Sequence, residues 1–90
     1  MNITQPGIYQ IPISKDGKYI ISFDVVNESA HIRIVRKRGF NAKMINESSL
    51  MFAYDDSYSY SVSLCSGDVI IFHVMKCDEI NNVVVEEVLL

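Results

Sequence analysis

Large apolar residues alternate with small or polar ones along several short stretches of this chain. The clearest case, SYSYSVSL, runs from Ser57 to Leu64, and every second residue in it is a serine. A β-strand points successive side chains to opposite faces, so this alternation predicts a strand with one apolar face and one face of hydroxyls. The apolar face is expected to pack in a core.

Turn residues separate stretches of this kind at intervals of about ten residues, a spacing typical of β-sandwiches and barrels. Pro12 makes the first stretch an edge strand or a bulged one, and Asp16-Gly17 is expected to form a hairpin turn. A further turn is expected over residues 78–82. Strands are expected over residues 8–13, 18–26, 30–37, 50–54, 58–64, 69–75 and 83–90, with a short strand or a single helical turn near 43–45.

These strands predict an all-β chain that forms one domain over residues 1–90: an antiparallel β-sandwich, jelly-roll-like, with seven to eight short strands. Residues 69–75 and much of 83–90 are apolar on both faces, which is typical of strands that are covered on both sides. A sandwich of 90 residues is too small to cover two such strands by itself. We therefore expect a homo-oligomer.

Self-association is expected to use the hydroxyl face and the last strand. Small hydroxyls allow another backbone to approach closely, and the long charged side chains that usually protect exposed β-structure are missing between residues 57 and 64. The alternative is that the hydroxyl face is an ordinary solvated surface. The candidate self-association residues are Ser59, Ser61, Ser63, Val83, Val85 and Leu89.

The formal net charge of −3 argues against nucleic acid and anionic membranes as partners. No apolar run approaches the ~20 residues of a membrane helix, and the first residues do not resemble a signal peptide. We therefore expect a cytoplasmic or virion location. Five of the eight basic residues lie between Arg33 and Lys43, either as a solvated hairpin or as a contact for an acidic partner. The candidate partner-binding residues are Arg36, Lys37, Arg38, Phe40, Asp55 and Asp56.

The sequence predicts no catalytic residue, metal site or cofactor. The histidines, His31 and His73, stand in no recognisable pairing with a nucleophile. Two cysteines and two histidines without regular spacing do not suggest zinc. Cys65 and Cys77 flank one expected strand and are predicted to be free thiols.

Two stretches resemble the jelly rolls of tumour-necrosis-factor-like and complement globular-head domains. They are DGKYIISFDVV, from Asp16 to Val26, and YSVSLCSGDVIIFHV, from Tyr60 to Val74. Similar patterns occur in phage receptor-binding and decoration domains. The resemblance implies a trimer with the last strands near its axis, and it implies no chemistry.

From these features we expect a non-catalytic structural or interaction protein. It would be a small oligomeric subunit such as a phage virion head, fibre or decoration protein, in contact with a capsid or tail protein or with a host surface receptor. One alternative is a carbohydrate- or receptor-binding module, in which Tyr54, Tyr58 and Tyr60 would stack on a sugar. Another is a small inhibitor that binds a host protein.

Overall fold

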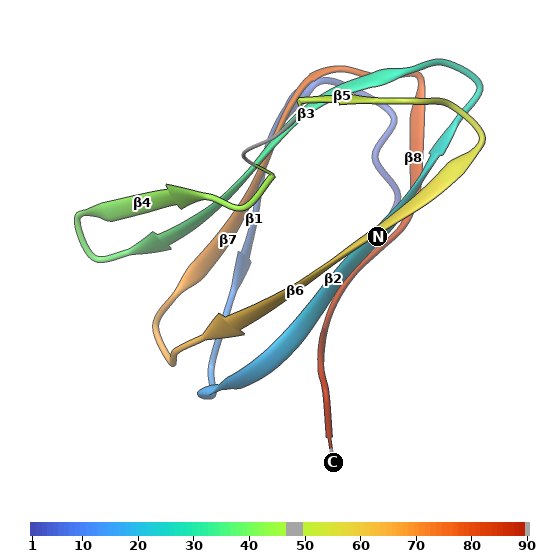
Figure 1. Ribbon diagram of the computed structural model, residues 1–90. Coiled ribbons are helices and arrows are strands. Elements are labelled where there is room, and N and C mark those ends of the chain that lie inside the picture. The colour runs from blue at the N-terminus through green and yellow to red at the C-terminus, as the bar shows by residue number, and fades with distance from the viewer. Residues whose placement is uncertain (47–49, 90) are drawn as a thin grey trace.

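The computed structural model describes residues 1–46 and 50–89, and this part of the chain forms eight strands in two antiparallel sheets packed face to face (Figure 1). The predicted all-β sandwich is therefore confirmed. The strands are β1 (Gly7–Pro12), β2 (Gly17–Val26), β3 (Ala30–Arg38), β4 (Asn41–Met44), β5 (Met51–Phe52), β6 (Asp56–Leu64), β7 (Val69–Lys76) and β8 (Glu79–Glu87).

One sheet has three strands in the order β6-β2-β8, and the other has the order β1-β7-β3-β4, with β5 also paired to β3. Consecutive strands β1, β2 and β3 therefore lie in alternate sheets, as in a jelly roll. The Asp16-Gly17 hairpin prediction is wrong, because these residues cross from one sheet to the other. Asp16 Oδ1 accepts a hydrogen bond from the backbone N–H of Ser66 at 2.7 Å, and Gly17 opens β2 opposite Leu64.

The core lies between the sheets and follows the period of two in the sequence. Phe23 of β2 is at its centre: its ring centroid lies 5.2 Å from that of Phe52, 5.6 Å from that of Tyr58 and 6.0 Å from that of Phe72. The predicted core faces of β2, β3 and β6 are correct, because strand geometry sends every second side chain inward. The buried apolar residues of these strands are Tyr19, Ile21, Phe23, Val25, Ala30, Ile32, Ile34 and Leu64.

The irregular segment after β4 is held to β3 by a buried asparagine, Asn46. Its Oδ1 accepts a hydrogen bond from the N–H of Ile34 at 2.9 Å, and its Nδ2 donates to the carbonyl of Ile32 at 2.8 Å. The amide side chain thus takes the place of a paired strand where β4 has ended. This arrangement satisfies backbone groups that would be costly to bury without partners.

The two apolar strands differ in how far they match expectation. As expected for strand 69–75, the single chain does not cover both faces of β7: Ile71 and His73 on its outer face are half-buried, and Met75 is exposed. The last strand begins at Glu79 rather than after a turn at residues 78–82. Its pairing with β2 shifts register between Ser22 and Asp24, and Asn82 has a φ of 53°, so this asparagine lies in a bulge within the strand.

Candidate functional site

Among the strands that the structure describes, β6 has the longest outer edge without a protecting feature. β6 has nine residues, pairs with β2 without a register shift, and forms one end of the three-stranded sheet. From Ser57 to Leu64 it contains no charged residue and no proline. An exposed edge of this kind can pair with another chain unless something blocks it. We call this feature the β6 edge.

The outer strands at the other sheet ends each carry a feature that hinders pairing. β1 ends on Pro12, which lacks the N–H needed for a ladder. β4 has only four residues and carries Lys43. The first half of β8 is covered by the N-terminal segment: Ile3 exchanges two 2.8 Å hydrogen bonds with Ile80, and the Val83 N–H donates to the carbonyl of Met1 at 2.9 Å. Among the described residues, β6 alone lacks such protection.

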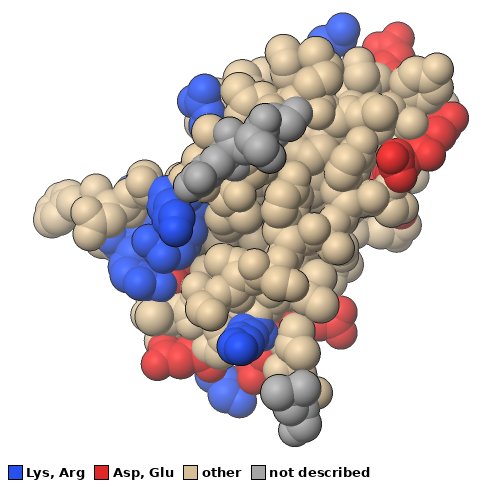
Figure 2. Space-filling view, viewed as in Figure 1, with Lys and Arg blue, Asp and Glu red and all other residues tan. Residues whose placement is uncertain are grey.

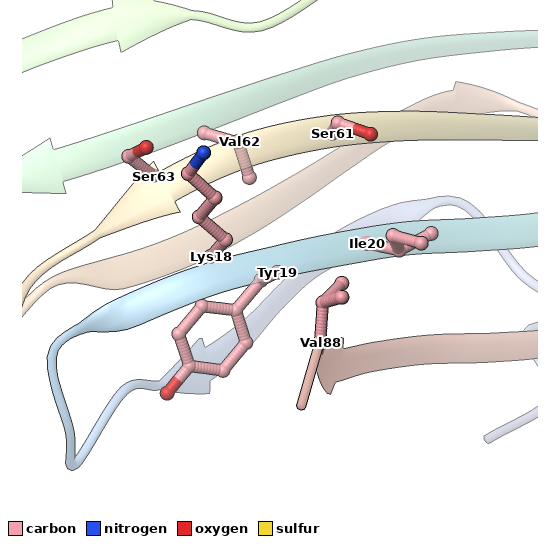
Figure 3. Close-up of a pocket in the computed structure, with 7 residues that line it drawn as sticks. All are labelled: Lys18, Tyr19, Ile20, Ser61, Val62, Ser63 and Val88. Atoms are coloured by element: carbon pink, nitrogen blue, oxygen red, sulfur yellow. The ribbon is translucent and has the colours of Figure 1, made fainter. Parts of the chain in front are cut away.

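The hydroxyl face of β6 lies beside a shallow groove of about 430 Å³ on the outside of the three-stranded sheet (Figure 3). Ser61 and Ser63 are exposed there and lie beside Lys18 and Ile20 of β2. Val88, just after β8, completes the lining on the far side. The serine side chains leave the backbone of β6 open to close approach.

The predicted self-association residues divide into two groups. Ser59, Ser61 and Ser63 are exposed, as is Leu89 at 79 %. Val83 is buried, so it is not available to another chain and this part of the prediction is wrong, while Val85 is half-buried and packs against the core. Val83 and Val85 share the inward face of β8, although the sequence pattern was assigned the opposite way round.

A second groove, of about 470 Å³, lies between the C-terminal half of β6 and the β3–β4 hairpin. Arg36 and Lys43 are cross-strand neighbours in that hairpin, and both line the groove opposite Ser61 and Ser63. The Nε of Arg36 is buried and has no hydrogen-bond partner in the described part of the chain. We call this feature the basic groove.

Arg38 was predicted to bind a partner, but the structure shows it paired within the chain. Its Nε and Nη2 donate to the two carboxylate oxygens of Asp68, each at 2.9 Å. Asp68 is 1 % exposed, and it also accepts the N–H of Cys65 at 2.8 Å. The hydrogen-bonded guanidinium is the main reason that the pKa of Asp68 falls to about 2. Arg38 therefore anchors the β6–β7 turn to the end of β3.

The remaining predicted partner residues lie in separate places. Lys37 is exposed on the outside of β3, and Phe40 is fully exposed at the hairpin tip after Gly39, whose φ is 58°. Asp55 and Asp56 lie at the start of β6, at the far end from the hairpin (Figure 1). One chain does not bring the basic and acidic candidates together.

Basic and acidic side chains are unevenly distributed. Figure 2 shows the largest group of basic side chains over the β3–β4 hairpin, and acidic side chains both at the opposite end of the sandwich and below the hairpin. At that acidic end, Asp24 accepts hydrogen bonds from Ser57 Oγ at 2.6 Å and from Asn82 Nδ2 at 2.7 Å. These bonds lower the pKa of Asp24, so its carboxylate stays charged.

The tyrosines of β6 pack inward rather than forming an exposed platform. The hydroxyl of Tyr58 accepts the N–H of Ala53 at 2.8 Å, and its ring packs edge-on against Phe52. Burial, followed by the proximity of Tyr58, raises the pKa of Tyr60. Tyr54 is the predicted sugar-stacking tyrosine that is exposed, at 58 %.

Other chemistry-bearing residues are scattered. His73 faces outward on β7 between Ile8 and Arg33, and His31 pairs with Lys76, so the two histidines occupy different positions along the five-stranded sheet. Both cysteines are free thiols in the structure. Within residues 1–46 and 50–89, no three His, Cys, Asp or Glu side chains could share a metal ion, and no helix could cross a membrane.

Comparison with known proteins adds no further assignment. No family model, no curated protein and no solved structure that was compared matches this chain. The site therefore has to be interpreted from its own geometry.

The period of two along β3 is a sequence signal for the basic groove. Ile32 and Ile34 face the core, and continuing the same period of two places Arg36 on the inner side of β3, where it faces β6 rather than solvent. The proximity of Arg36 to Ser61 depends on how the two sheets stack, which a single-strand pattern does not determine.

Proposed function

We propose that this protein is a non-catalytic interaction protein that works as a self-associated pair, with the β6 edge of one copy aligned antiparallel to the β6 edge of another. The observation that carries the proposal is that β6 alone among the outer strands is long, regular and unprotected in the described chain. Such an edge presents unpaired backbone donors and acceptors to the surroundings.

Antiparallel pairing of two identical edges would join the two three-stranded sheets into one sheet. A twofold axis perpendicular to the sheet keeps the hydroxyl faces on the same side, so the serines of both copies lie side by side. Ser59, Ser61 and Ser63 are small, and hydroxyl groups facing each other across strands can hydrogen-bond. The contact needs no rearrangement of the core.

The finer expectations remain predictions. The virion subunit, the trimer and the capsid, tail or receptor partner depend on resemblance alone. The sugar-binding alternative now depends mainly on Tyr54, because Tyr58 and Tyr60 pack against the core. We therefore propose self-association through β6 in preference to those alternatives.

The test compares the solution mass of the wild-type protein with that of Ser61→Lys by sedimentation equilibrium over a wide concentration range. A lysine at an exposed position of the edge should block strand pairing without disturbing the core. We expect twice the mass of one chain for the wild type and a single chain for Ser61→Lys at the same concentration.

The control is Ser14→Lys, which makes the same chemical change at an exposed position outside the strands. It should associate like the wild type. A wild-type protein that stays at the mass of one chain at millimolar concentration would refute the proposal. So would a Ser61→Lys variant that pairs as well as the control.

A further inference from the structure

We propose that Arg36 and Lys43 in the basic groove of one subunit bind the carboxylates of Asp55 and Asp56 of the partner subunit, and that these contacts set the antiparallel register of the pair. This inference rests on the proposed self-association through β6. It identifies the side chains that make one alignment of two otherwise featureless edges more favourable than the others.

The first step concerns the distribution of charge along β6. The strand begins with Asp56, directly after Asp55, and its other end borders the groove lined by Arg36 and Lys43. The two ends are eight residue steps apart, about 26 Å at the usual rise of a strand. The opposite charges are therefore too far apart to pair within one chain.

Antiparallel pairing of two copies brings the opposite charges together. When the twofold axis passes through Tyr60, the middle residue of β6, residue Ser63 lies opposite Ser57 of the partner subunit. Asp56 of the partner subunit then lies one position further along, beside the groove that contains Arg36. The symmetry repeats the contact at the other end, so a single pair of edges forms two clusters of opposite charge.

These charged groups are available for binding. Asp55 accepts only a long 3.4 Å hydrogen bond, from the N–H of Asn27, and Asp56 accepts the N–H of its own neighbour Ser57 at 2.9 Å. Neither carboxylate forms an ion pair with a described residue. The buried Nε of Arg36 also lacks a partner among these residues, and a carboxylate is the acceptor that best matches a guanidinium.

The same geometry favours a second copy over an unrelated acidic segment. An acidic peptide would satisfy one basic groove and leave the acidic end of β6 unpaired. A second copy satisfies both ends, and its strand supplies the backbone ladder between them. Charge complementarity of this kind selects orientation and register more than it adds affinity.

The test is a charge exchange between two variants. Arg36→Glu/Lys43→Glu reverses the basic groove, and Asp55→Asn/Asp56→Lys reverses the acidic end. Asparagine is chosen at position 55 because Asp55 has a φ of 54°, a conformation that asparagine tolerates. Each variant alone should pair about tenfold more weakly than the wild type or worse, because like charges would meet at both ends.

An equimolar mixture of the two variants should recover pairing close to that of the wild type. In the mixed pair, one end joins the unchanged groove to the unchanged acidic end, and the other joins the two reversed ones. A chain that carries all four substitutions should also pair with itself. The control, Arg33→Glu/Lys76→Glu, makes the same change in charge at exposed positions of the five-stranded sheet and should pair normally.

The outcomes separate this inference from the proposed function. Wild-type chains that do not associate would overturn both. Wild-type pairing that persists unchanged in both variants would overturn only the charge contacts, as would variants that pair weakly and fail to recover on mixing. An unrelated acidic peptide that binds the wild-type groove, when the mixed variants fail to pair, would assign the groove to another partner. That result would also overturn the inference.

Discussion

At the scale of single residues, a few polar side chains hold the ends of strands in place. Asn46 satisfies backbone groups of β3 where no strand continues, and Asp68 joins the β6–β7 turn to Arg38. Each is about 1 % exposed, so removing either would leave buried groups without partners. The folded state depends on the charge of Asp68 in a way that pH can test.

The carboxyl of Asp68 has a pKa of about 2 in the folded protein, below its ordinary 3.8. A lowered pKa means that the unfolded chain takes up the proton first, so this contribution to stability is full above pH 3.8 and is lost as the pH falls towards 2. We expect Asp68→Asn to lower the Tm by at least about 5 °C at pH 7. The difference from the wild type should nearly vanish at pH 2.

Thermal unfolding followed by circular dichroism at pH 7, 4 and 2 measures this difference. Glu28→Gln is a suitable control, because Glu28 is exposed and its carboxylate forms no ion pair among the described residues. If Asp68→Asn lowered the Tm by the same amount at all three pH values, the charge of the carboxylate would not be what stabilises the turn.

At the scale of elements, the N-terminal segment acts as a short added strand along β8. The side chain of Ile3 is 1 % exposed, and its backbone exchanges both hydrogen bonds with Ile80. This segment leaves the β8 edge without free ladder positions at Ile80 and Val83. Its packing is therefore what distinguishes β8 from β6.

Shortening the Ile3 side chain should release this segment. We expect Ile3→Ala to lower the free energy of unfolding by about 3 kcal/mol, because a buried isoleucine loses most of its contacts. The amide protons of Ile80 and Val83 donate to Ile3 and Met1, and in the variant they should exchange faster than in the wild type. The amide proton of Ile21 in the central strand should be affected less.

Chemical denaturation and amide hydrogen exchange measure these two effects. The matched control is Thr4→Ala at the exposed neighbouring position, which should change neither quantity. Unchanged exchange at Ile80 and Val83 in a destabilised Ile3→Ala protein would mean that the segment is held without the Ile3 side chain.

At the scale of the whole molecule, two electrostatic effects oppose each other. Each chain has a formal net charge of −3, so two copies repel, while the proposed contacts of Arg36 and Lys43 attract. The repelling charges are spread over a molecule 35 Å long, beyond the screening length of about 10 Å at 0.1 M salt. The close contacts should therefore dominate.

We accordingly expect the Kd of self-association to rise as salt is increased from about 0.05 M to about 0.5 M. The Arg36→Glu/Lys43→Glu variant should show the reverse trend, because salt would screen the repulsion at its ends. Sedimentation equilibrium at several salt concentrations measures both trends. A Kd that falls with salt in the wild type would indicate that apolar contact, rather than charge, holds the pair.

The fold was predictable from sequence where a local pattern determines the structure. The alternation at Tyr19, Ile21 and Phe23 identifies a strand and its core face, since the period of two is a property of the strand itself. It does not reveal which sheet a strand joins, because that depends on pairing between distant residues. For the same reason, Asp16-Gly17 was taken for a hairpin when it crosses between sheets.

The candidate site was predictable only in part. The exposed serines of β6 and the basic character of residues 33–43 were evident, but the groove that joins them was not, since it forms between different sheets. The pairing of Arg38 with Asp68 was not evident either, because Asp68 lies 30 positions away in the chain.

The closure of three outer strands has a consequence for the size of any assembly. A subunit with two open edges can bind a neighbour on each side and grow into a fibre without limit. In the described part of this chain the ladder positions of β8 at Ile80 and Val83 are occupied by Ile3 and Met1, while β1 ends in proline and β4 is short. If the chains pair through β6 as proposed, these features should favour a closed pair over continued growth.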